Sequence, residues 1–310
     1  MSTHDAATGS AKAAGTLTGI GLMLVGIFLF SANDALGKWL VSSHSVGQLL
    51  LIRSLATIAV LAPFVWRAGI YVWRAAPRPR LQLARAALAA VEVAAFYGAV
   101  AELPLAEVMT YYLAGPLYVT ALSPLLLGER IGWRRWTAVT VGFVGVVVAI
   151  DATPTSLGWG TALALFGSFA FALLLVTTRM LAATSGLVLI SGQAIGAVVC
   201  GGALAMLDWT PVSATGAGLM VLLGIVAMVA ALCVNRALQI APASVVAPFE
   251  FMLIVWGALF GYLLFGEAPS WRTVIGAAII CASGVYIILR ERAVGRQIAS
   301  SPDVAATSHS

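Results

Sequence analysis

One passage of the sequence occurs twice, at residues 103–136 and again at residues 241–273. The two copies align when Glu267 is placed on Glu129, at an offset of 138 positions. The same offset superposes six further identical pairs: Pro104 and Pro242, Val108 and Val246, Leu126 and Leu264, Gly128 and Gly266, Trp133 and Trp271, and Arg134 and Arg272. Each copy is an apolar run closed by Gly-Glu and followed by Trp-Arg and a second apolar run, which is typical of a helical hairpin. Recurrence at a single offset predicts two structurally equivalent halves.

The apolar runs place the chain in a membrane. They are about 20 residues long, the length that a helix needs to cross a bilayer core of about 30 Å. The chain is 61% hydrophobic and 9% charged, whereas a soluble fold of this size needs far more charge on its surface. Its three cysteines lie within apolar runs without metal-ligand spacing, and its three histidines lie outside those runs. We therefore predict an integral membrane protein without a metal or cofactor.

Polar breaks divide the apolar runs into ten predicted transmembrane helices. They span residues 17–40, 46–66, 82–101, 104–127, 132–150, 157–178, 186–207, 215–237, 242–265 and 271–290. The first is interpreted as a retained helix rather than a cleaved signal peptide, because polar residues interrupt its apolar run. The predicted organisation is a polar cytoplasmic tail (1–16), a first five-helix repeat (17–150), a second five-helix repeat (157–290) and a cytoplasmic C-terminal tail (291–310).

The arginines and lysines predict the orientation. With the amino terminus inside, fourteen of the 17 basic residues fall in inner segments and two in outer segments, while Arg53 lies within a span. Because each repeat has an odd number of helices, the second enters the membrane from the opposite face. The expected fold is therefore an all-α membrane protein with ten transmembrane helices arranged as two inverted five-helix repeats. We expect it in a bacterial-type inner membrane with both termini cytoplasmic, and its net charge of +5 requires no nucleic acid.

The chain resembles the EamA branch of the drug/metabolite transporter superfamily. The resemblance is carried by SPLLLGERIGWRRWTAVTVGFVGVVV, by APFEFMLIVWGALFGYLLFGEAPSWRTVIGAAIICASGVYI, and by the polar first helix ending at Lys38 with Arg53 in the second. It implies exchange or proton-coupled transport of small metabolites, such as amino acids, vitamins including riboflavin, nucleotide-like compounds or drugs. It also implies a cavity between the first, third, fourth, sixth, eighth and ninth helices.

Ionisable side chains within the spans are the first candidates for a site, because each costs several kcal/mol unless it meets a partner or a wet cavity. Asp34 and Lys38 are four residues apart and are expected to pair on one helix, either as a structural pair or as part of the cavity. Asn33, next to Asp34, is predicted to bind substrate. Arg53 is interpreted as a structural or gating residue that snorkels or pairs with an acid. These three charged residues form the predicted coupling or gating group.

Glu92 lies near the centre of the third span without a basic residue on its own helix. It could bind a proton or a cationic substrate, or it could make a packing hydrogen bond. Phe96 lies one turn further along the same face and Tyr97 sits beside that face. All three are predicted to line the cavity.

Glu250 lies deep in the ninth span, and the repeat offset makes it equivalent to Tyr112. The same offset makes Asn235 equivalent to Tyr97. Polar residues at symmetry-equivalent positions favour a shared central cavity, so these residues are predicted to bind substrate. Two further candidates lie in the fourth helix, Tyr111 and Tyr118. Their rings could stack on a planar substrate, or they could serve only in interfacial packing. Glu107 is placed at the outer mouth or at a helix start, and Glu129 and Glu267 are interpreted as hairpin caps.

The sequence argues against other functions. An intramembrane protease needs a serine–histidine pair, an HExxH motif or paired aspartates, and the spans contain none of these. A channel is the remaining alternative, but inverted halves with polar residues near the midplane favour alternating access. The prediction is a secondary carrier and not an enzyme. Its expected partners are a small-molecule substrate and membrane lipid, with a homodimer left open.

Overall fold

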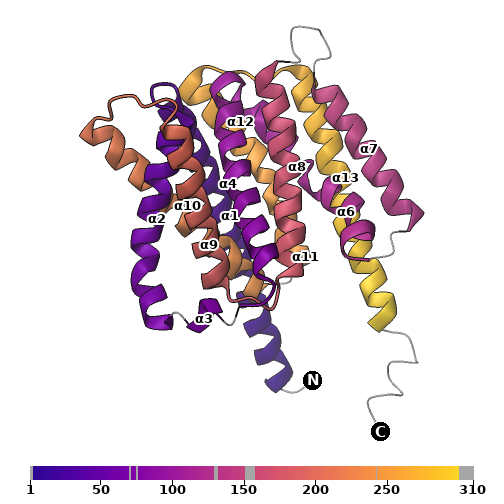
Figure 1. The fold of residues 1–310 in the computed structure, drawn as a ribbon. Coiled ribbons are helices and arrows are strands. Elements are labelled where there is room, and N and C mark those ends of the chain that lie inside the picture. The colour runs from indigo at the N-terminus through magenta and orange to yellow at the C-terminus, as the bar shows by residue number, and fades with distance from the viewer. Residues whose placement is uncertain are drawn as a thin grey trace.

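The computed structural model describes residues 3–69, 71–74, 76–128, 132–150, 158–241 and 243–299, and within these ranges the chain is helical or in short connections. The first half contains α1 (Thr3–Val41), α2 (Val46–Ala68), α3 (Tyr71–Arg74), α4 (Pro79–Glu102), α5 (Leu105–Tyr112), α6 (Gly115–Leu126) and α7 (Trp133–Ala149) (Figure 1). The second half contains α8 (Trp159–Met180), α9 (Gly186–Ala205), α10 (Ala214–Ile240), α11 (Ala243–Val246), the 3-10 helix η1 (Ala247–Phe251), α12 (Met252–Phe265) and α13 (Trp271–Ala299).

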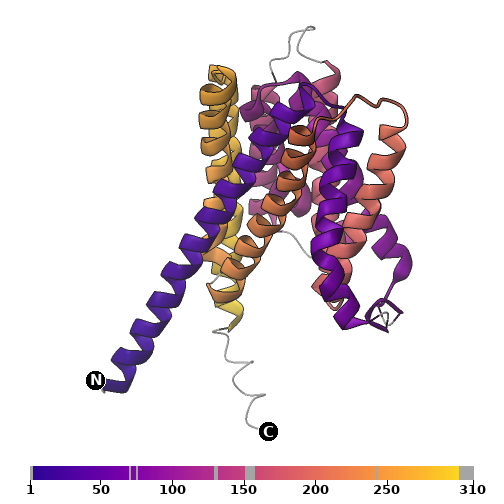
Figure 2. The ribbon, with the colours of Figure 1, turned by 90° about the vertical axis from the view of Figure 1, so that its left-hand side faces the viewer.

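Among the residues that the structure describes, seven helical segments are long and apolar enough to cross a membrane, and the shorter apolar segment Trp271–Ile287 opens α13. The seven lie in α1, α2, α4, α8, α9 and α10 and at Pro248–Phe265. This composition and length confirm the prediction of an all-helical, multi-pass membrane protein. The helix α1 begins earlier than the predicted span, at Thr3, and its first turns extend beyond the bundle (Figure 2).

The predicted fourth and ninth helices are each interrupted rather than continuous, near the proline that each span contains. The fourth is divided between α5, which ends at Tyr112, and α6, which has Pro116 in its first turn. The ninth begins as α11 and passes through η1, which contains Pro248 and Glu250, before α12. A proline cannot donate to the helical ladder, so each break frees backbone carbonyls. The two breaks fall at positions related by the repeat offset.

The turns that close the two hairpins share one backbone conformation. Gly128 and Gly266, which are equivalent in the repeat, have φ angles of 69° and 67°. This left-handed conformation favours glycine, and it ends a helix by directing the chain back across its last turn. At the second turn, the N–H groups of Gly266 and Glu267 donate to the carbonyls of Tyr262 and Gly261 at 3.0 Å. The second Gly-Glu motif is therefore a helix-ending turn, as predicted, whereas Glu129 lies outside the described residues.

Helices from the two halves interleave. The helix α1 packs along α10, α2 along α9, and α4 against both α8 and α9. The helices α7 and α13 pack on each other at one side of the bundle (Figure 1). The start of α1 and the end of α13 lie at the same end of the molecule in both views (Figures 1 and 2). The interior where α1, α2, α4 and α5 meet holds the buried side chains described next.

Candidate functional site

A group of polar side chains, here called the polar centre, lies where α1, α2 and α4 meet. Its members are Asn33, Asp34, Arg53, Glu92 and Tyr97. The Arg53 Nη1 atom donates to the Tyr97 hydroxyl at 2.9 Å, and the Asn33 side-chain amide donates to the same oxygen at 3.3 Å. The Arg53 guanidinium also lies over the Tyr97 ring, 5.4 Å from its centroid. One phenol thus connects three helices, and it is only 1% exposed.

Two carboxylates share the electrostatic field of this one arginine. Asp34 and Glu92 each interact with the charge of Arg53, and also with each other. The Asn33 side chain lies beside Asp34 and donates to Tyr97. Ionised, the two acids and one arginine carry a formal charge of −1. Because charges act strongly on one another where little water screens them, this arrangement can attract a cation or hold a proton.

Aromatic rings, here called the aromatic wall, border the polar centre. They are Phe96, Tyr112 and Phe171. Phe96 packs edge-to-face on Tyr112 with centroids 5.2 Å apart, and Phe171 lies 6.2 Å from Tyr112. The Tyr112 hydroxyl donates to the backbone carbonyl of Glu92 at 3.3 Å, which joins the end of α5 to α4. Such rings can stack on a planar ligand.

Phe171 and Gly37 are site residues that sequence reasoning missed. The repeat offset was the available signal for Phe171, because it maps this residue of α8 onto Asn33 in α1. Gly37 carried no signal in the sequence. In the structure, a Cβ atom at Gly37 would collide with the Tyr97 ring and lie 3.0 Å from its hydroxyl oxygen.

Replacing Gly37 with alanine is expected to displace Tyr97, which Arg53 and Asn33 hold in place. The matched control is Gly21→Ala in the same helix, because a Cβ there meets nothing within 4 Å. We expect Gly37→Ala to lower the melting temperature and reduce transport at least about tenfold, since overpacking a filled interior costs about 1–3 kcal/mol. Gly21→Ala should match or slightly exceed the parent in stability, because alanine favours helix. Equal melting temperatures and equal transport rates for the two variants would contradict the packing argument.

Lys38 does not form the predicted pair with Asp34. Its ammonium group forms an ion pair with Glu267 at 2.5 Å and donates to the Leu103 carbonyl at 2.6 Å. The other carboxylate oxygen of Glu267 accepts the backbone N–H of Leu105, the first residue of α5, at 3.0 Å. The lysine prefers this partner because it lies in the last turn of α1 and reaches beyond the helix end. We call this arrangement of Lys38, Glu267 and the backbone of Leu103 and Leu105 the end clamp.

The remaining predicted residues lie outside the polar centre. The Tyr111 hydroxyl donates to Glu107 on its own helix at 2.7 Å, and Glu107 lies in the first turn of α5 as predicted. Tyr118 packs against Phe143 and Phe169. The side chains whose binding role depended on repeat symmetry are both exposed on the second half: Asn235 and Glu250. Substrate binding stays a prediction for four residues: Tyr111, Tyr118, Asn235 and Glu250.

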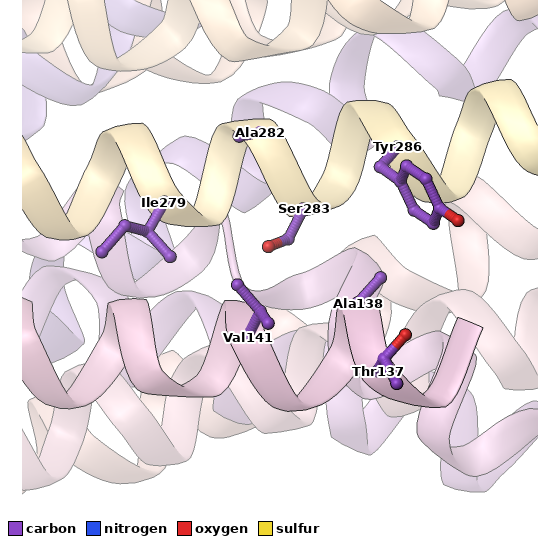
Figure 3. A pocket seen from close by; sticks show the side chains of 7 residues that line it. All are labelled: Thr137, Ala138, Val141, Ile279, Ala282, Ser283 and Tyr286. Carbon is purple, nitrogen blue, oxygen red and sulfur yellow. The ribbon is translucent and has the colours of Figure 1, made fainter. Parts of the chain in front are cut away.

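A separate groove lies between the peripheral helices α7 and α13 (Figure 3). Its lining is mainly apolar, with hydroxyl groups from Thr137, Ser283 and Tyr286. Ser283 is buried and Tyr286 is exposed. None of its lining residues belongs to the polar centre, so this groove is distinct from the candidate site.

Comparisons with known proteins agree with this architecture. The model of the EamA-like transporter family matches residues 17–150 and again residues 158–290. An S-adenosylmethionine uptake transporter of Rickettsia felis is 26% identical over 279 residues, covering 89% of this chain and 94% of that protein. A riboflavin transporter of Rhizobium johnstonii is 28% identical over 236 residues, covering 74% and 76% of the two chains.

A solved crystal structure with 19% sequence identity has the same fold, with a TM-score of 0.57. The alignment covers 91% of this chain and 99% of that one. The two family matches coincide with the two halves that the duplicated Gly-Glu passage indicated. The chain therefore belongs to the EamA-like transporter family and is a multi-pass membrane transporter of small metabolites.

Proposed function

We propose that this transporter is a secondary carrier that works by alternating access, with the polar centre as its substrate site. The observation that carries the proposal is the convergence of Asp34, Glu92 and Arg53 between three helices in the interior of the bundle. Charged groups within a membrane are costly, and they persist where they serve a substrate or ion pathway. The break between α5 and α6 places Tyr112 against this centre, and interrupted helices commonly border transporter sites.

The proposed topology has ten crossings in two inverted repeats. Three features support it: the ends of α1 and α13 lie at one end of the bundle, the interrupted helices are equivalent in the two repeats, and helix packing is interchangeable between them. In the repeat, α1 is equivalent to α8 and α10 is equivalent to α4. The helices α1 and α10 pack on each other, and so do their equivalents α8 and α4. The same proposal places the protein in an inner membrane with both termini cytoplasmic, and it leaves monomer and homodimer as alternatives.

The relatives suggest which substrates to test first. S-adenosylmethionine and riboflavin, named for two of them, both contain a planar ring system. The aromatic wall supplies surfaces on which such a ring can stack. We propose a substrate of this general kind, a small metabolite with a planar ring.

A carrier and a channel differ in what proteoliposomes containing the purified protein should show. We expect saturable uptake that is stimulated by unlabelled substrate on the opposite side. The end clamp favours the carrier, because it ties α1, α5 and the turn after α12 together at one end of the bundle. Conductance without saturation would instead assign a channel.

Substituting Glu92 with glutamine tests whether the polar centre is the site. We expect at least a tenfold loss of transport efficiency at equal membrane abundance, because the change removes one charge facing Arg53 and keeps the side-chain shape. Glu102→Gln is the matched control, since Glu102 lies on the same helix, is exposed and ends α4. If both variants transport like the parent, the polar centre is not the substrate site.

A further inference from the structure

We infer that the polar centre selects organic cations, specifically compounds with a net charge of +1, N–H donors and a planar ring. This inference rests on the proposed function and names the substrate class of the same site. Three observations lead to it: the charge of the centre, an unpartnered buried acceptor, and the position of the aromatic wall.

The charge of the centre is the first observation. Asp34 and Glu92 act on the same guanidinium, so Arg53 balances one of the two carboxylates. Lys38 lies one helical turn from Asp34 and carries the nearest further positive charge on α1, but its ammonium group is held by Glu267 and the Leu103 carbonyl. One carboxylate therefore lacks a cationic partner of its own. A bound monocation would make the centre neutral. With a neutral metabolite bound, this carboxylate would have to take up a proton for the centre to be neutral.

The second observation is the Oδ1 atom of Asn33. This side chain is 3% exposed, and within the described part of the chain its Oδ1 atom has no hydrogen-bond partner. In the structure the Nδ2 group of this amide donates to the Tyr97 hydroxyl, which leaves Oδ1 as the free acceptor. A buried acceptor without a partner is unfavourable, because it has lost its hydrogen bonds to water. A ligand with an ammonium or amino N–H group would satisfy this acceptor.

The aromatic wall is the third observation. Phe96 packs on both Tyr97 and Tyr112, so the rings of the wall continue directly from the polar centre. A cation close to the face of an aromatic ring is attracted to it, and a planar ring can stack on the same surface. A ligand with its positive group at the carboxylates and its ring on the wall would use all three features at once.

The test compares two probes that differ in charge and by one methyl group. S-adenosylmethionine carries a sulfonium, and S-adenosylhomocysteine is the corresponding neutral thioether. Binding to the purified, detergent-solubilised protein is measured by thermal shift across a concentration series, with riboflavin as a neutral planar probe. We expect the sulfonium compound to bind about tenfold or more tightly than the thioether, because it adds one favourable charge interaction in a poorly screened site.

Two variants connect this preference to the polar centre. Glu92→Gln should bring the affinity ratio of sulfonium to thioether close to one, and Asn33→Leu should weaken both compounds because it removes the shared acceptor. Glu102→Gln should keep the parent ratio. Equal affinities in the parent, or tighter binding of the neutral probes, would overturn the cation assignment.

The carrier role has its own readout. Counterflow of a labelled metabolite panel in proteoliposomes tests transport irrespective of charge. Saturable counterflow of neutral compounds alone would overturn the inference and leave the carrier standing. Absence of counterflow for every compound, with binding of the sulfonium probe retained, would reject the carrier role and leave the selectivity of the site in place.

Discussion

Replacing Arg53 with methionine is expected to destabilise the protein by about 3 kcal/mol and to abolish saturable transport. The guanidinium is the donor to Tyr97 and the counter-charge to Asp34 and Glu92. Methionine keeps much of the side-chain volume but leaves two acids without a positive partner in a poorly hydrated interior. A lost hydrogen bond from a charged donor has a cost of about this size, and the loss of the positive charge adds to it because the two acids are then uncompensated.

A second substitution separates charge from packing. Combining Arg53→Met with Asp34→Asn removes one of the two uncompensated carboxylates, so we expect the double variant to recover part of the lost stability. Such non-additivity is the signature of residues that act on each other directly. Arg67→Met is the matched control, because Arg67 lies in the last turn of the same helix and is exposed. The measurement is thermal unfolding in detergent, with transport assayed at equal abundance.

The charge argument has a clear point of failure. If Arg53→Met unfolds at the same temperature as Arg67→Met, the guanidinium does not balance the two acids. If the double variant is less stable than Arg53→Met alone, the loss arises from packing rather than from charge. In that case Arg53 would act mainly through Tyr97, and the fit of α10 against the Arg53 backbone at Gly224 would become the feature to test.

Most of the fold could be predicted because it follows from two features of the sequence: apolar runs long enough to cross a membrane, and an internal repeat. Runs of about 20 apolar residues can span a membrane only as helices or closed barrels, since every backbone group must be satisfied internally. The repeat offset then related Gly128 to Gly266, and both adopt the left-handed conformation that ends a helix. Pro116 and Pro248 indicate from the sequence alone where the fourth and ninth helices are weakened, because a proline lacks the N–H donor. Whether such a helix bends or breaks depends on the neighbouring helices, which the sequence does not show.

The polar centre was predicted one residue at a time, and its assembly could not be. Asn33, Asp34, Arg53, Glu92 and Tyr97 were each recognisable as polar groups within apolar spans. Their convergence depends on how α1, α2 and α4 pack, which no local pattern specifies. The pairing of Asp34 with Lys38 was wrong for the same reason: spacing along a helix shows that two side chains can meet, not that a better partner is absent.

Symmetry was a better guide to the fold than to the site. The repeat offset makes Glu250 equivalent to Tyr112 and Asn235 equivalent to Tyr97. In the structure, Tyr97 belongs to the polar centre and Tyr112 is hydrogen-bonded to it, whereas Glu250 and Asn235 lie outside it. Equivalent positions share a backbone environment, but the two repeats carry different side chains there. The same offset leads correctly from Asn33 to Phe171, a residue of the aromatic wall, because that pair lies on α1 and α8 beside the centre.

Breaking the end clamp should have the second large effect. Lys38→Met leaves the Glu267 carboxylate with the Leu105 N–H as its remaining described partner, and Glu267→Gln leaves the Lys38 ammonium with the Leu103 carbonyl. The two side chains are 10% and 23% exposed, so water screens them poorly. We expect each single variant to lose about 3 kcal/mol, the lower part of the range for buried pairs. The double variant should lose clearly less than the sum of the two, because the pair is removed as a unit.

Amide hydrogen exchange gives a local readout of the same prediction. The Leu105 N–H is the first donor of α5, where a carboxylate also interacts favourably with the helix dipole. Peptides that cover residues 103–110 should therefore exchange faster in Glu267→Gln and Lys38→Met than in the parent, while Glu102→Gln, beside the same connection, should not change them. Alternating access requires this end to open in another state, so the faster-exchanging variants should also populate that state more. The prediction would be contradicted if the stability losses of the two single variants simply added in the double variant and the exchange rates of residues 103–110 stayed unchanged. The end clamp would then not stabilise this end of the bundle.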